Sequence, residues 1–490
     1  MHRSLAQHPT ASARVRPGRS LLRVLGACSI ALCGVLSGCG SSPARLTDEQ
    51  VQRNLESVDF VHARIKERHF DPAKVGPAWD QAHAEARQAV AQSRTMPEAR
   101  AAMSTLIASL QQSHFGLIAA EAYAEAGLGN SDASRPESGS GESGANAGID
   151  LRVVEGEATV TRVTPGSSAE QAGLRPGDLV RRIDGRSTAN LIDAVGKIYE
   201  GKPDQAMMLN ASLVSSLQGA EGSTLRLSVV DSSGRERDVS LRRTTPSGTP
   251  VKFGHLPTMF LSIDEKRLTP AAGETGGPIG YLRFDLWFDP VRVNQAVTRL
   301  VEGCADCSGV VIDLRGNIGG LGAMAMGVGG WFIDRPNQRL GELITRENTL
   351  RFVVNPRPRP FTGPLAILID PLSVSTSEIF AGGMQDLGRA RIFGQPTPGA
   401  ALPSTVEVLP NGDRLQYAFA NYVSFRGEAL EGSGVQPDER VEPTRRALQD
   451  GRDEVLDAAV RWIRSNPAAS TPPASPTAST SNAGASGSQR

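Results

Sequence analysis

The hydrophobic pattern changes along the 490-residue chain and divides it into segments. Over residues 44–125 apolar side chains recur at intervals of three and four, which predicts an N-terminal helical domain. The second half instead contains short apolar runs that end at turn-forming residues, as buried strands do. These runs cover residues 279–284, 309–314, 365–369 and 391–394, and helical segments separate them. The alternation predicts an α/β core with a layered sheet over residues 252–463.

Two segments lack any such periodicity. Residues 127–147 are rich in Ser, Gly, Glu and Asn, which predicts a flexible linker. Residues 466–490 are small and polar, which predicts a disordered tail because such a composition buries too little apolar surface to fold.

The N-terminus indicates a cellular compartment. Arginines precede an apolar stretch at residues 24–36, which is too short to span a bilayer. The stretch ends in Leu36-Ser37-Gly38-Cys39, which looks like a bacterial lipobox. We therefore predict that residues 1–38 are a lipoprotein signal peptide and that Cys39 is lipidated, with the protein facing the periplasm. Gly40 favours the outer over the inner membrane. An ordinary secretory signal with a chance cysteine is the alternative.

The charge and the cysteine content argue against several classes of function. The 52 basic and 52 acidic residues balance, and the body has no basic run, so nucleic-acid binding is not expected. Apart from Cys39, the mature chain keeps Cys304 and Cys307. Without a second pair, a zinc or redox site is disfavoured, and a loop disulfide or two free thiols are expected. We expect no metal and no cofactor, and the sequence does not indicate the oligomeric state.

Candidate chemistry lies at the ends of two predicted strands. The first strand leads into Asp313-Leu314-Arg315-Gly316-Asn317-Ile318-Gly319-Gly320, and the second leads into Ser375-Thr376-Ser377-Glu378. A hydroxyl at a helix start that faces a glycine turn with free amides is the arrangement of a serine hydrolase. By itself Ser375-x-x-Glu378 is more often a capping box than a nucleophile, and Ser373 and Ser377 are alternative nucleophiles.

Residues 148–244 resemble a PDZ domain. The resemblance rests on Gly148-Ile149-Asp150-Leu151 and on the run from Pro165 to Asp178. In such a domain the amides of the glycine-led loop bind a peptide carboxylate and the next strand pairs with the peptide, so Gly148, Ile149, Asp150 and Leu151 are the expected peptide-binding residues. Residues 190–222 are longer than a PDZ domain needs, which predicts a covered or reshaped groove. A structural β-domain that binds nothing is the alternative.

The two turn motifs together resemble the carboxyl-terminal processing (tail-specific) serine peptidases. The resemblance implies a ClpP/crotonase-like core, Ser375 as nucleophile, and the N–H groups of Gly320 and Thr376 as the oxyanion hole. One departure is important, because Ala400 stands where those enzymes carry a lysine base and no lysine follows Lys266.

A related branch, the tricorn-like peptidases, uses a Ser-His-Ser-Glu tetrad instead of a Ser/Lys dyad. Ser113-His114 and Glu431 match its pattern, with Glu428 as the fallback for the acid. The resemblance implies that His114 is the base and that Ser113 and Glu431 orient it.

We therefore expect a cell-envelope serine endopeptidase that cleaves polypeptides through an acyl-enzyme, with substrates captured by the PDZ domain. The alternative is a degenerate peptidase fold that binds a peptide or an apolar ligand, or that acts as an envelope scaffold. The placement of His114 relative to Ser375 distinguishes the two.

Overall fold

The computed structural model describes residues 44–121, 144–270 and 276–466. The predicted signal peptide, Cys39, most of the predicted linker and nearly all of the predicted tail lie outside these residues. Within the described ranges, no helix is both long enough and apolar enough to span a bilayer.

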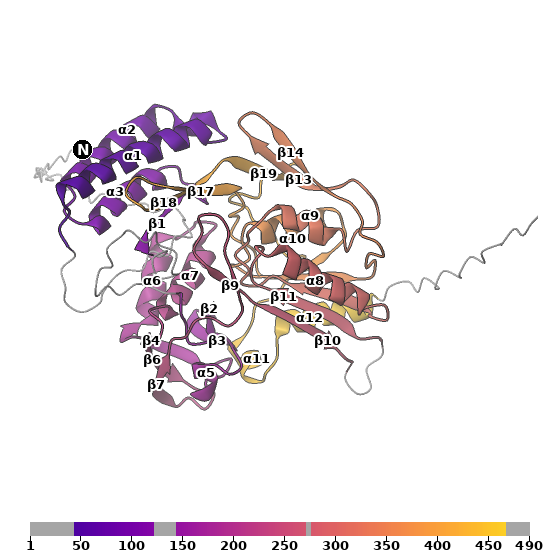
Figure 1. Cartoon of the computed structure of the whole chain (residues 1–490). Helices are drawn as coiled ribbons and strands as arrows, with labels where there is room; N and C mark the ends of the chain where they lie inside the picture. Colours follow the sequence, from indigo (N-terminus) through magenta and orange to yellow (C-terminus); the bar gives the residue numbers. More distant parts are fainter. Residues whose placement is uncertain (1–43, 122–143, 271–275, 467–490) are drawn as a thin grey trace, which may run out of the picture.

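The N-terminal part is helical, as predicted. It consists of α1 (Asp48–Arg68), the 3₁₀ turn η1 (Pro72–Val75), α2 (Pro77–Gln92) and α3 (Met96–Ala108). The helices α1 and α3 begin at capping boxes led by Thr47 and Thr95. Their apolar faces pack on one another and on residues of the C-terminal half, including Leu415 and Tyr417. The helices at the top left of Figure 1 are thus joined to the core by a shared apolar cluster.

The PDZ segment forms a sheet in the order β2-β3-β4-β6-β7. Its strands are β2 (Ile149–Val154), β3 (Glu157–Val163), β4 (Leu179–Ile183), β6 (Thr224–Val230) and β7 (Glu236–Arg242), and the short β5 (Arg186–Ser187) pairs with β4. Its helices are α5 (Ser168–Gln171), α6 (Thr188–Ile198) and α7 (Gln205–Leu217). The overlong stretch at 190–222 therefore holds most of α6 and the whole of α7.

The core is a six-stranded sheet in the order β10-β11-β12-β15-β16-β20. Its strands are β10 (Ile263–Leu268), β11 (Ile279–Phe284), β12 (Gly309–Asp313), β15 (Leu365–Ile369), β16 (Arg391–Gly394) and β20 (Glu439–Arg440). Only the β10–β11 pair is antiparallel, and the remaining neighbours are parallel. The four predicted core strands are confirmed to within a residue.

Helices cover both faces of this sheet. On one face lie α8 (Pro290–Glu302), α9 (Ala323–Gly329) and α10 (Thr376–Asp386), and on the other lies α12 (Glu454–Ser465), which follows α11 (Arg445–Gln449). Two separate apolar clusters result, one on each face. The predicted layered α/β core is confirmed (Figure 1).

Smaller sheets connect the helical part to the core. The strand β1 (Gly116–Ile118) begins two residues after His114 and pairs with β18 (Arg414–Ala418), which pairs with β17 (Ser404–Val408). A second sheet joins β14 (Thr349–Val354), β13 (Gln338–Thr345) and β19 (Ala420–Ser424), and β8 (Thr249–Val251) pairs with β9 (Met259–Leu261). The pairing of β1 with β18 carries His114 toward the core.

The two cysteines of the core are joined. A disulfide links Cys304 to Cys307 in the connection from α8 to β12. Of the two possibilities that the sequence left open, the structure thus has the loop disulfide.

Candidate active site

The position of Ser375 sets it apart from its neighbours. It follows β15 as the N-cap of α10, with φ 61° and ψ −115°, and it is partly exposed. A non-glycine residue with positive φ is strained, and such strain often marks a functional site. Ser373 and Ser377 are fully buried, and their hydroxyls donate to the carbonyls of Leu314 and Asn317. These two alternative nucleophiles are therefore excluded by burial and bonding.

The glycine turn after β12 approaches Ser375 closely. A Cβ on Gly319 would lie 2.7 Å from the Cβ of Ser375, and one on Gly320 would lie 2.5 Å from the carbonyl oxygen of Trp287. Both glycines also have φ values, 93° and 148°, that larger residues avoid. Only glycine therefore fits at either position.

The turn also orients its amides. Trp287 donates its N–H to the carbonyl of Gly319 and accepts from the N–H of Leu321, so the groups of Gly320 point away from Trp287. The carbonyl of Gly320 accepts from the hydroxyl of Thr376 at 2.9 Å. Within the described ranges, the N–H groups of Gly320 and Thr376 donate to no protein acceptor. Two amide donors next to a serine are what an oxyanion hole requires.

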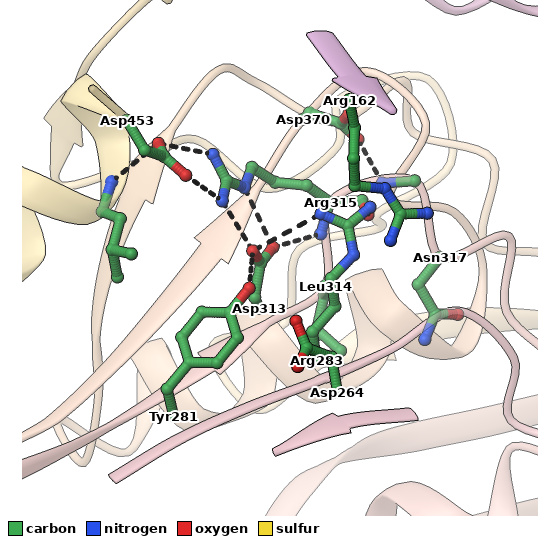
Figure 2. A network of polar contacts seen from close by, with 12 residues as sticks. Arg162, Asp264, Tyr281, Arg283, Asp313, Leu314, Arg315, Asn317, Asp370 and Asp453 are labelled. Atoms are coloured by element: carbon green, nitrogen blue, oxygen red, sulfur yellow. Dashed lines mark hydrogen bonds and ion pairs between the residues drawn. The ribbon is translucent and has the colours of Figure 1, made fainter. Parts of the chain in front are cut away.

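A buried ionic network fixes the start of the turn (Figure 2). Arg315 lies between Asp313 and Asp453 and donates to both carboxylates at 2.6–2.9 Å, while the hydroxyl of Tyr281 donates to Asp313 at 2.8 Å. Burial alone would raise the pKa of Asp313, but the charges of Arg315 and Arg283 hold it well below its usual range. Because Asp313 stays ionised, the network remains intact and anchors the turn.

Asp370 connects this turn to the segment before Ser375. Its carboxylate accepts from the N–H groups of Gly316 and Leu372, at 2.8 and 2.9 Å. It also accepts from Nε of Arg152, on β2 of the PDZ segment, at 3.3 Å. One carboxylate therefore joins the glycine turn, the approach to the nucleophile and the PDZ segment.

Glu378 holds the loop that passes beside Ser375. Its buried carboxylate accepts from the N–H of Ser375 at 2.9 Å, the hydroxyl of Thr397 at 2.7 Å, and the N–H groups of Gly399 and Ala400 at 2.8 and 3.0 Å. Burial raises the pKa of Glu378 to about 7, against the effect of these hydrogen bonds. The residue predicted as part of a capping box thus also anchors the loop at 397–400.

His114, Ser113 and Glu431 form one hydrogen-bonded relay. The carboxylate of Glu431 accepts from both the N–H and the hydroxyl of Ser113, each at 2.8 Å. The Ser113 oxygen lies 2.8 Å from Nδ1 of His114. Ser113 and Glu431 are 318 positions apart in sequence, and the structure brings them into contact. Glu428, the fallback for the acid, is exposed.

The relay defines the tautomer of His114. Because the Ser113 hydroxyl donates to Glu431, its oxygen accepts the proton on Nδ1, which leaves Nε2 as an acceptor. Burial lowers the pKa of His114 to about 4, so the ring is neutral at pH 7. Burial raises the pKa of Glu431, and the negative charge of Asp204 adds to this effect. The ring therefore has the protonation state of a general base.

The loop at 397–401 connects the relay to the nucleophile. The N–H of Ala401 donates to Glu431 at 3.3 Å, and the carbonyl of Ala400 accepts from the N–H of Ser375 at 3.0 Å. Among the described residues, no hydrogen bond joins His114 to Ser375. Catalytic hydrogen bonds are often long in the absence of substrate, so this geometry is compatible with a base and a nucleophile.

Ala400 lies in an apolar environment. It is 4% exposed and packs with Met207 of α7, Leu372 and Val374. The position at which the lysine-dependent peptidases carry their base is thus occupied by a small apolar side chain in a filled cluster.

The predicted peptide-binding residues lie at the start of β2. Gly148 accepts from the N–H of Thr164, and Asp150 pairs with Arg162 at 2.8 Å. Further along this strand, the N–H of Val153 donates to the side chain of Asn210 at 2.8 Å, and α7 packs directly on the strand. The helix α7 therefore occupies the edge of β2 at Val153, beyond the four predicted residues, where the length of the segment had suggested a covered or reshaped groove.

Comparison with known proteins gives separate matches for the core and for the PDZ segment. Residues 278–441 match the model of peptidase family S41, and residues 159–210 match that of a PDZ domain. The core is a peptidase family S41 domain. The S41 domain thus includes the glycine turn, Ser375, Glu378 and Glu431, whereas His114 precedes it.

Individual relatives agree with this assignment. A probable CtpA-like serine protease of Staphylococcus haemolyticus is 25% identical over 297 residues, which are 60% of this chain and 52% of that protein. The carboxyl-terminal-processing protease of Picosynechococcus sp. is 26% identical over 356 residues, 71% of this chain and 74% of that protein. The chain thus spans about half of the first relative and three quarters of the second.

Solved structures share the fold. The photosystem II D1 C-terminal processing protease superposes with a TM-score of 0.51 at 20% identity, over 84% of this chain and 100% of that one. Mature CPAF complexed with lactacystin superposes with a TM-score of 0.57 at 13% identity, over 85% of this chain and 98% of that one.

Sequence reasoning missed two features of the S41 site. The first is the anchoring of the loop at 397–400 by Glu378, although the capping-box motif had already singled out this glutamate. The second is the apolar contact of α7 with the segment before Ser375. Its only signal was the unusual length of the PDZ segment.

Proposed function

We propose that the protein is a serine endopeptidase that cleaves polypeptides through an acyl-enzyme, with Ser375 as nucleophile and His114 as base. The observation that carries this proposal is the Glu431–Ser113–His114 relay, which leaves Nε2 of a neutral imidazole unprotonated. The relay also favours a Ser-His-Ser-Glu tetrad over a Ser/Lys dyad, in agreement with Ala400.

In the proposed reaction, His114 Nε2 takes the proton of Ser375 as its hydroxyl oxygen attacks the substrate carbonyl. The negative charge on the carbonyl oxygen is stabilised by the N–H groups of Gly320 and Thr376, each worth about 3 kcal/mol in comparable sites. The imidazolium then gives its proton to the leaving amine, and water attacks the acyl-enzyme with His114 again as base. Ser113 and Glu431 keep the ring in the required tautomer throughout.

A fluorophosphonate probe tests the nucleophile. We expect covalent labelling of the wild type and none of Ser375→Ala, because the probe reacts only with an activated serine. Glu428→Gln is the matched control and should label normally, since this side chain is exposed. An unlabelled but folded wild type would favour a degenerate peptidase fold that binds a peptide or an apolar ligand.

We further propose that Cys39 carries a lipid that holds the protein on the periplasmic side of the bacterial envelope, with the outer membrane favoured. The support is the lipobox-like Leu36-Ser37-Gly38-Cys39 sequence. Cys39→Ser should move the protein from the membrane pellet to the soluble fraction. A mutant that still pellets would show that something other than the lipid retains it.

We also propose that the PDZ segment captures substrate carboxyl termini at Gly148, Ile149, Asp150 and Leu151. The side chain of Asn210 on α7 occupies the edge of β2 at Val153, beyond these four residues. A long substrate with a free apolar carboxyl terminus should have a higher kcat/KM than the same substrate with an amidated terminus. Equal values would mean that the segment only supports the core.

A further inference from the structure

The helix α7 has two apolar faces. One face points into the PDZ segment, where Leu213 and Leu217 join its apolar cluster and Asn210 binds the β2 backbone. The other face carries Met207, Met208, Ala211 and Val214, which pack against residues of the S41 domain. A helix at the surface of a domain needs only one apolar stripe, so the second face requires a separate explanation.

The second face meets the catalytic segment. Its contacts are Leu372, Val374 and Ala400, of which Val374 immediately precedes Ser375 and Ala400 accepts the N–H of Ser375. Asp204, the N-cap of α7, is close enough to Glu431 for its charge to act on that carboxylate. The helix therefore passes both the nucleophile and the relay.

The helix brings no charge to this face. Residues Gln205–Leu217 include no charged side chain. Met207 is buried at 2% exposure and fixes the helix to the core, whereas Met208, Ala211 and Val214 remain partly exposed. An apolar surface beside a nucleophile lacks the groups that would pair with a charged substrate residue, and it can bury an aliphatic one.

We propose that Met208, Ala211 and Val214 form the wall of the subsite that receives the substrate side chain adjoining the scissile bond, and that they restrict it to apolar residues. This inference rests on the proposed peptidase function. The flexible thioether of Met208 adapts to side chains of different shape, while Ala211 sets the depth of the wall. The PDZ segment thus supplies a specificity element for the S41 domain.

Two substitutions of opposite sense test the wall. The assay measures kcat/KM for peptide libraries varied at the residue on each side of the scissile bond. Met208→Ala enlarges the subsite and should shift the preference toward larger apolar residues. Ala211→Leu fills it and should shift the preference toward alanine. One methylene in an apolar pocket discriminates by roughly 10–200-fold, so shifts of about tenfold are expected.

The matched control is Ser216→Leu, which adds the same side chain on a part of α7 that helical geometry turns away from Ala211. It should leave the preference unchanged. The proposed subsite wall would be disproved if Met208→Ala and Ala211→Leu kept the wild-type substrate preference while Ser375 was labelled normally and thermal unfolding was unchanged. Absence of labelling in the wild type would instead overturn the proposed peptidase function, so the two failures are distinguishable.

Discussion

Replacing Glu431 by Gln should abolish most activity without removing any catalytic side chain. The two carboxylate oxygens have different partners, because one accepts from the Ser113 N–H at 2.8 Å and the other from the Ser113 hydroxyl at 2.8 Å and the Ala401 N–H at 3.3 Å. A glutamine amide can place its oxygen at only one of these positions. Its NH₂ group must then face a donor at the other.

The distances indicate which orientation is favoured. An NH₂ group placed toward the Ser113 N–H would face that donor at 2.8 Å, whereas in the reverse orientation the NH₂ group faces the N–H of Ala401, a more distant donor at 3.3 Å. In the reverse orientation the amide donates to the Ser113 oxygen, so the hydroxyl proton turns toward Nδ1 of His114. The proton of the ring then moves to Nε2, which can no longer accept the proton of Ser375.

A wrong tautomer of the base costs about 10⁴-fold in kcat in another Ser/His hydrolase. Because the relay here acts through an intervening serine, we expect a loss of about 10³–10⁴-fold, equivalent to ~4–5.5 kcal/mol of transition-state stabilisation. The free energy of unfolding should change far less, by about 1–2 kcal/mol for the one donor left unpaired.

The assay is kcat/KM on a peptide substrate, with Glu428→Gln as control and with urea unfolding of each variant. Nitrogen NMR of His114 reports the tautomer directly, and Nε2 should be protonated in Glu431→Gln. A Glu431→Gln enzyme within about tenfold of wild type, or one that keeps the Nδ1–H tautomer, would refute the relay.

Other predictions concern the same site. Ser375→Ala and His114→Ala combined should lose no more activity than the worse single variant, since the residues act as one unit; additive losses in kcat would contradict this. An NMR titration should give His114 a pKa of about 4. Because this folded-state pKa lies below the unfolded value of about 6.5, the free energy of unfolding should decrease as pH falls from 6.5 toward 4, and a pKa near 6.5 would show that the ring is solvated. Ala400→Lys should not rescue His114→Ala, because Met207, Leu372 and Val374 fill the space around it. Overpacking should instead reduce stability by about 1–3 kcal/mol, measured by urea unfolding, and near wild-type turnover would disprove this reasoning.

The sequence by itself determined the elements and the local geometry of the nucleophile. The apolar runs at 279–284 and 365–369 predicted β11 and β15, because strand periodicity is a property of neighbouring residues. The glycine turn and the position of Ser375 at a helix start could be predicted for the same reason, since turns and caps are made by residues a few positions apart. For the contact of α7 with β2, the sequence offered only the excess length of residues 190–222, which predicted a covered or reshaped groove.

Only the tertiary structure decided which distant groups meet. Glu431 contacts Ser113 across 318 positions because the pairing of β1 with β18 and the loop at 397–401 bring the two segments together. The second face of α7 could not be assigned from its sequence, because an apolar stripe does not specify the surface against which it packs. Hydrophobic burial has no direction, so the partner of each stripe is set by the packing of the whole chain.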